Sequence, residues 1–269
     1  MKKYIFMAVA GMLALSSCSN DNDETIAKKA PQKMTFTAGF GDGAQTRATL
    51  DGSTRTVSFN AGDEISILSA NNNNVKFTTT AGGATASFDG TAVAGDPTYY
   101  AIYPHTDGLN LSSTTITGVK IPKNQSAAAS SSCGWDPAAP IAYATSTDGT
   151  SLTFHNLCAL LKVTNDVGDD ITIRILGNYD LSGMFNLNTS TGVLDYKSTE
   201  GEVDVSGVPN GKTIYIAIAP GEKTEFYAYR TSGTNIYYRY KSSVTFEAGK
   251  IYDLGNTSSW TDEFIFPFP

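Results

Sequence analysis

The chain has 269 residues, of which 41% are hydrophobic and 17% charged, and its formal net charge is −7. An acidic chain without a basic stripe is a poor candidate for binding nucleic acid, because such binding relies on Lys and Arg at the phosphates. The length allows two domains of ordinary size. With 14 Tyr, 13 Phe and 25 Gly, the composition favours β-strands and turns over a helix bundle.

The N-terminus has the pattern of an export signal. Lys2-Lys3 precede an apolar run over residues 4–15, which is too short to span a bilayer as a mature helix. The run ends in Leu15-Ser16-Ser17-Cys18, which resembles a bacterial lipobox, whose Cys becomes the acylated first residue. We therefore predict a lipoprotein signal peptide over residues 1–17 and lipidation at Cys18. An ordinary signal peptide with an incidental Cys is the alternative.

From about residue 34 onward the pattern is short strands separated by turns. Ile65 and Ile67 are followed by a polar tip and then by Val75 and Phe77, which predicts a hairpin. Similar apolar segments recur at intervals of roughly 10–20 residues, as is typical of a sandwich or barrel. These segments are residues 84–88, 99–103, 116–121 and 141–144.

A second series of strands begins near Ser151. Between residues 152 and 163, apolar side chains occur at both odd- and even-numbered positions, which predicts one strand buried on both faces. Because a low-complexity stretch over residues 126–140 precedes this series, we expect a domain boundary near residue 150. The expected fold is all-β, with two tandem β-sandwich domains over residues 48–150 and 151–257. Clean alternation also predicts strands over residues 171–175, 181–187 and 214–218, and a hairpin over residues 227–240.

No catalytic or metal site is expected. His155, Asn156 and Cys158 could suggest a Cys-His-Asn protease, but residues 155 and 158 differ by an odd number, so on one strand they would face opposite sides and could not act as base and nucleophile. No Cys/His cluster has zinc spacing, and no glycine-rich loop has the pattern that cradles phosphate. We therefore predict a protein that is not an enzyme and uses no cofactor. A disulfide between Cys133 and Cys158 is permitted in an exported chain, but two cysteines do not decide it.

The segment just before the body of the fold has two features that indicate function. Arg47, followed by Ala48, lies in a Gly/Gln/Thr-rich stretch, and an exposed Arg in a loop is a good site for an Arg-specific protease. A solvated loop Arg is the alternative. Upstream of it, four apolar side chains alternate with Thr and Gly, which predicts a first strand carrying Met34, Phe36, Ala38 and Phe40.

The C-terminal residues form a second unusual segment, the tail over residues 258–269. Phe264, Phe266 and Phe268 alternate with Ile265 and Pro267, beyond the apparent end of the fold. An apolar strand without a partner is a liability in a monomer, but it could fill a groove in a neighbouring molecule by strand donation. A strand that folds back on its own domain is the alternative. The prolines limit the backbone hydrogen bonds that such a donor can make.

Five segments together resemble the fimbrillin-like family of bacterial surface lipoproteins, the type V pilins. They occur in the family's order: GDEISI at 62–67, YAIYP at 100–104, IPKNQ at 121–125, FHNLCALLKV at 154–163 and FEAGKIY at 246–252.

The resemblance implies two transthyretin-like domains and export to the cell surface as an outer-membrane lipoprotein. It also implies cleavage at Arg47-Ala48 by an Arg-specific protease, which would remove residues 18–47, the tether and first strand. The opened groove would accept a strand from another pilin subunit, in a fimbrium that supports cell adhesion. The alternative function is a surface lipoprotein that binds glycans through aromatic side chains gathered on an outer face, such as the tyrosines of residues 227–240.

Overall fold

A computed structural model of the chain describes residues 29–41, 58–127, 134, 136, 138–232 and 235–261. The regular structure of these residues consists of β-strands and one short 3-10 helix, η1 (Thr257–Ser259). None of the helices in the described part is long and apolar enough to cross a membrane. The expectation of an all-β fold is confirmed.

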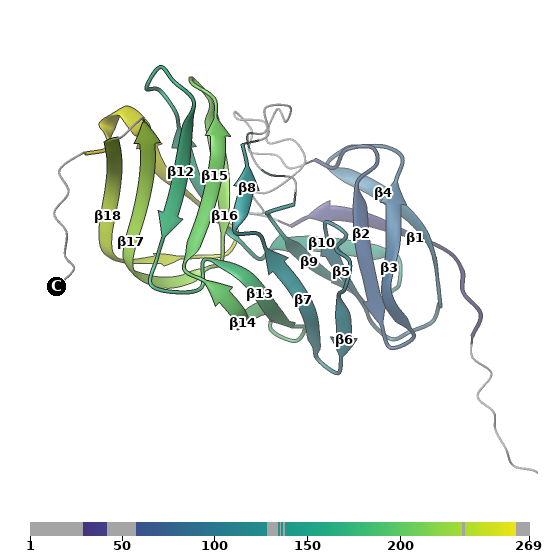
Figure 1. Ribbon diagram of the computed structural model, residues 1–269. Helices are drawn as coiled ribbons and strands as arrows, with labels where there is room; N and C mark the ends of the chain where they lie inside the picture. Colours follow the sequence, from purple (N-terminus) through teal and green to yellow (C-terminus); the bar gives the residue numbers. More distant parts are fainter. Residues whose placement is uncertain are drawn as a thin grey trace, which may run out of the picture.

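The N-terminal half forms a closed seven-stranded barrel, at one end of the molecule (Figure 1). Its strands follow the order β1-β10-β9-β5-β2-β3-β4 around the wall. Phe and Tyr side chains dominate the interior, because alternate residues of each strand point inward. The strands are β1 (Gln32–Phe40), β2 (Glu64–Ser69), β3 (Asn72–Thr79), β4 (Thr85–Ala92), β5 (Tyr99–Tyr103), β9 (Ala142–Ser146) and β10 (Ser151–Asn156).

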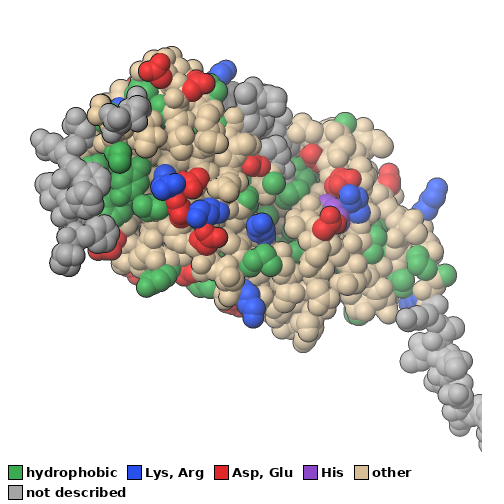
Figure 2. Space-filling view, viewed as in Figure 1, with side chains coloured by type: hydrophobic (Ala, Val, Ile, Leu, Met, Phe, Trp, Pro, Cys, Tyr) green, Lys and Arg blue, Asp and Glu red, His purple; other side chains and the backbone are tan. Residues whose placement is uncertain are grey.

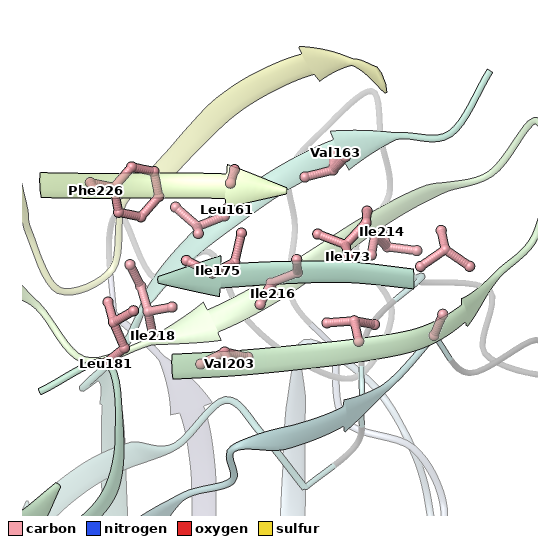
Figure 3. Packing of buried hydrophobic residues seen from close by; sticks show 14 of the residues in the cluster. Leu161, Val163, Ile173, Ile175, Leu181, Val203, Ile214, Ile216, Ile218 and Phe226 are labelled. Atoms are coloured by element: carbon pink, nitrogen blue, oxygen red, sulfur yellow. The ribbon is translucent and has the colours of Figure 1, made fainter. Parts of the chain in front are cut away.

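Two facing sheets form the C-terminal half. A five-stranded sheet has the order β18-β17-β12-β15-β8, and a three-stranded sheet has the order β16-β11-β19. Aliphatic side chains from both sheets pack together between them (Figure 3). The strands are β8 (Asn124–Ser126), β11 (Ala159–Thr164), β12 (Ile171–Leu176), β15 (Glu202–Val208), β16 (Thr213–Ile218), β17 (Gly221–Ser232), β18 (Asn235–Phe246) and β19 (Ile251–Asn256).

A four-stranded sheet of order β14-β13-β7-β6 lies between these two parts of the molecule (Figure 1). Phe185 and Ile116 from this sheet share a hydrophobic core with Ile102 of the barrel and Leu160 of β11. This shared core joins the two halves. The strands are β6 (Asn110–Ser112), β7 (Thr115–Ile121), β13 (Ser182–Asn188) and β14 (Val193–Glu200).

The sheets differ from the expected pair of tandem transthyretin-like sandwiches. One half is a closed barrel, and strands from both sides of residue 150 occur in the same sheets. The barrel takes in β10, while β7 pairs with β13 and β8 pairs with β15. Pairings between strands so far apart in sequence leave no mark on local periodicity, so the sequence patterns could not reveal them.

The prediction of one long strand over residues 152–163 is wrong. The segment forms β10 in the barrel and β11 in a different sheet. Between them lie Leu157 and Cys158, which are both buried. The N–H of Leu157 donates to the carbonyl of Ile141 at 2.9 Å, where the chain leaves the barrel. Consecutive buried residues in such a connection look like a strand that is buried on both faces.

Candidate functional site

The predicted first strand is β1, and it is part of the barrel wall. It pairs antiparallel with β4, from Gln32 opposite Ala92 to Gly39 opposite Thr85. On its other edge it pairs in parallel with β10, from Thr37 opposite Ser151 to Phe40 opposite Phe154. Because β1 bonds to a strand on each side, its removal would leave two unpaired sheet edges facing one gap.

The predicted inward side chains of β1 face the barrel interior. Phe36 and Ala38 are fully buried, and Met34 and Phe40 are half-buried against the same core. The Phe36 ring contacts Phe77 and Tyr99, with centroid separations of 5.4 and 5.5 Å. Removing β1 would therefore also expose an apolar groove.

Phe40 closes one end of the barrel as part of an aromatic cluster. Its ring stacks on Phe59 at a centroid separation of 4.9 Å, and it lies 6.0 Å from Tyr103 and 5.8 Å from Phe154. Aromatic pairs at such separations contribute beyond the area that they bury. The Tyr103 hydroxyl donates to the Asp63 carboxylate at 2.6 Å, which fixes the cluster to the turn before β2.

The turn before β10 holds that strand in place against β1. The Asp148 carboxylate accepts hydrogen bonds from the backbone N–H groups of Thr150 and Ser151 and from the Ser146 hydroxyl. These hydrogen bonds stabilise the charged carboxylate and so hold the pKa of Asp148 below its usual range. The bond from the Thr150 N–H makes the largest contribution. The Thr150 carbonyl then accepts from the N–H of Thr37 at 2.7 Å, so the turn is bonded directly to β1.

Asn156 stands at the far end of β10, and the sequence analysis, which weighed it only beside His155 and Cys158, did not predict its environment. Its side chain is 6% exposed, and neither its amide nitrogen nor its amide oxygen has a hydrogen-bond partner. Every second residue of β10 is buried, and Asn156 is the third buried residue after Leu152 and Phe154. This alternation is visible in the sequence. A polar residue at the third buried position was the feature that could have indicated a buried polar group.

His155 and Cys158, the two residues weighed as a catalytic pair, lie in different environments. His155 belongs to β10, whereas Cys158 is free, fully buried and beyond the end of that strand. Burial raises the pKa of the Cys158 thiol to about 12, so the thiolate needed for nucleophilic chemistry is disfavoured. Among the described residues no group of His, Cys, Asp and Glu is placed to hold a metal ion.

Several predicted site residues lie outside the described residues. They are Cys18, Arg47, Ala48, Phe264, Phe266 and Phe268. The last described residue of the tail, Thr261, exchanges two backbone hydrogen bonds with Tyr238 of β18, at 2.8 and 3.2 Å. The described chain therefore ends against the outer edge of β18, at the opposite end of the molecule from β1 (Figure 1).

A cluster of tyrosines covers the outer face of the β17–β18 hairpin. Tyr227 lies opposite Tyr240 across the hairpin, and Tyr229 lies opposite Tyr238. The ring centroids of these two pairs are 4.7 and 6.2 Å apart. Figure 2 shows hydrophobic side chains gathered over this hairpin, at the left of the molecule. A hollow of about 470 Å³ near β18 and β19 is lined partly by Tyr238, Tyr240 and Arg239, but Arg239 lies opposite the buried Ala228 and so belongs to the inner face of the hairpin, not to the tyrosine face.

The fold matches solved structures, although no protein-family model and no curated protein matches the sequence. A proposed cell adhesion protein from Bacteroides ovatus is 15% identical, covering 87% of this chain and 95% of that chain with a TM-score of 0.51. Another from Bacteroides uniformis is 17% identical, covering 85% and 94% with the same TM-score of 0.51. The chain shares its fold with these two proteins.

A fimbrial assembly protein from Parabacteroides distasonis also matches, at 13% identity, 84% and 90% coverage and a TM-score of 0.39. At these identities the likeness itself is one of fold.

Proposed function

We propose that this protein is a structural subunit of a cell-surface fimbrium that supports adhesion, and that it assembles by strand exchange. In this proposal the chain is exported as a lipoprotein to the outer membrane and matured by Arg-specific cleavage between Arg47 and Ala48. The observation that carries the proposal is the place of β1. This strand pairs with β4 on one edge and with β10 on the other, and it lies upstream of the cleavage position. After cleavage only non-covalent contacts would hold it.

The fold supports the same proposal. Two solved structures that share it are described as proposed cell adhesion proteins, which is the role assigned to this subunit here.

The positions of the chain's two ends favour assembly into a fibre. The strand to be removed lies in the barrel, whereas Thr261, in the described part of the tail, lies against β18 at the opposite end of the molecule (Figure 1). A donor segment at one end and an acceptor groove at the other make a head-to-tail contact between subunits. Contacts of this kind build open filaments when the rotation between subunits does not close a ring.

The tail provides the candidate donor, and its prolines fit one edge of the groove better than the other. In β1 the N–H groups of Thr37 and Gly41 donate toward β10, so residues of the opposite parity point their N–H groups toward β4. If the tail runs in the same direction as β1 and Phe264, Phe266 and Phe268 face inward, Pro267 occupies a position whose N–H would point toward β10. The tail would then keep its donors toward β4 and lose hydrogen bonds to β10, each worth about 1 kcal/mol net.

The N-terminus of the protein on intact cells tests the maturation step. We expect mass spectrometry of assembled surface material to find Ala48 as the first residue. Surface material that begins at Cys18 throughout would contradict cleavage of this subunit and would favour a role in which the lipid anchor is kept.

Lipidation gives a separate prediction. Changing Cys18→Ala is expected to abolish incorporation of a fatty-acid probe, because the acylated sulfur is lost. The control is Cys158→Ala, which removes a buried thiol and should leave labelling intact. Equal labelling of Cys18→Ala and the unchanged chain would contradict the lipobox interpretation.

The tyrosine cluster favours a second candidate function, the binding of glycans. Stacked rings on an outer sheet face could hold a sugar by ring contacts. We expect Tyr240→Ala to reduce binding on a glycan array at least fivefold, with the exposed Tyr179→Ala, outside this cluster, as the matched control. If the unchanged protein binds no glycan on the array, this second function fails.

A further inference from the structure

The groove occupied by β1 has a small site between two large ones. Ala38 is fully buried and lies opposite Ala86 on β4 and Leu152 on β10. Its inward neighbours along β1 are Phe36 and Phe40, whose rings fit among other aromatic side chains. Because protein interiors are close-packed, the site under Ala38 has the volume of a methyl group and not of a ring.

The Phe-rich tail of an identical copy does not follow this order of sizes. Any placement that puts rings of the tail in the sites of both Phe36 and Phe40 brings Phe266 to the site of Ala38. This holds for a donor running in either direction, because Phe266 is the middle ring of the three. Extra volume in a packed core forces neighbouring side chains out of their preferred rotamers.

Beyond the second ring, the groove presents a polar group. The inward residues Ala38 and Phe40 of β1 pair with Leu152 and Phe154 of β10, and the pair of Phe40 with Phe154 is the last. The next inward residue of β10 is Asn156, whose buried amide has no partner on either atom. A buried amide without hydrogen bonds is unfavourable. A donor strand that extends two residues past the second ring could supply the missing bond.

We propose that this groove selects its donor strand by the order of the donor's inward side chains, which is large, small, large and polar. The amide of Asn156 would bind the polar side chain. The best-fitting donor is therefore a strand of another kind of subunit, and the tail of an identical copy is a poor one. This inference rests on the proposed strand exchange at the same groove. It names the partner as a chain with a small residue between two aromatic residues of one strand face.

The test measures peptide binding to the protein after cleavage at Arg47 and removal of the released segment. A labelled peptide of residues 32–41 establishes that the groove accepts a strand. Two competitor peptides cover residues 262–269, one unchanged and one carrying Phe266→Ala. We expect the Phe266→Ala peptide to bind at least about tenfold more tightly, which corresponds to about 1.4 kcal/mol.

The role of Asn156 is tested with peptides of residues 32–41 that are extended by either Ser or Leu. The unchanged groove should bind the Ser peptide roughly fivefold more tightly than the Leu peptide, because the Ser hydroxyl can form a hydrogen bond with the unpartnered amide of Asn156. In the Asn156→Leu variant this preference for Ser over Leu should reverse. A preference that Asn156→Leu does not alter would contradict the assignment of Asn156.

The outcomes separate the inference from the function on which it rests. If the 32–41 peptide binds and the two tail peptides bind equally, selection by size is wrong while strand exchange stands. If the 32–41 peptide does not bind to the cleaved protein, the groove accepts no strand. In that case both the inference and the proposed function fail.

Discussion

Replacing Phe154 with Ala is expected to lower the free energy of unfolding by about 3–5 kcal/mol, the usual cost of removing a buried Phe ring. Phe154 is fully buried on β10 and packs against Phe40 of β1, with Tyr103 6.0 Å away. Its loss leaves a hole at the end of the barrel where β1 is held. We therefore expect a second effect, which is faster opening of β1 in the uncleaved chain.

A matched control separates this local effect from general destabilisation. Phe185 is also fully buried, but it belongs to β13 and to the core between the two halves. Phe185→Ala should cost a similar free energy in urea unfolding without selectively exposing β1 to hydrogen exchange. If the two variants speed exchange of the β1 amides equally, the cluster around Phe40 has no special part in retaining this strand.

Local alternation was sufficient to predict many of the strands. Ile171, Ile173 and Ile175 share the buried face of β12, as expected, and Ile214, Ile216 and Ile218 do so in β16. The predicted hairpin with a polar tip is formed by β2 and β3. These features follow from the two-residue period of a strand with one buried face, which a single sequence displays directly.

Long-range pairing could not be predicted in this way. The parallel pairing of β1 with β10 brings Phe40 beside Phe154, far away in the chain. The short strands β6 and β8 each pair with only a few residues, which is too little for a periodic pattern. Whether the buried amide of Asn156 has a hydrogen-bond partner depends on the groups that surround it in space, so the sequence alone could not show that it has none.

Cleavage after Arg47 is expected to make β1 exchangeable. In the intact chain the strand is tethered to its groove, and covalent tethering gives an effective concentration on the order of millimolar. Once cut and diluted to about 1 μM protein, the same strand rebinds at a rate set by its free concentration. Its occupancy should then respond to dilution and to competitors, with an advantage for competitors of roughly a thousandfold over the tethered case.

The matched control for this prediction is Arg47→Ala treated with the same protease. Because Arg55 also lies between β1 and β2, the control and its reference both carry Arg55→Ala, so that Arg47 is the only arginine that differs between them. Release of β1 from the Arg47→Ala control at the same rate as from the reference that keeps Arg47 would show that cleavage at Arg47 is not the step that frees the strand.

The most direct measurement is the binding of a fluorescent peptide of residues 32–41 to the protein before and after cleavage, at micromolar concentration and followed by anisotropy. The account predicts no detectable binding to the intact chain, because the tethered β1 outcompetes the peptide, and saturable binding after cleavage. Equal binding to both forms would contradict it, because the peptide would then occupy some other surface. Absence of binding to the cleaved protein after release of its own β1 would contradict it as well, because no acceptor groove would exist.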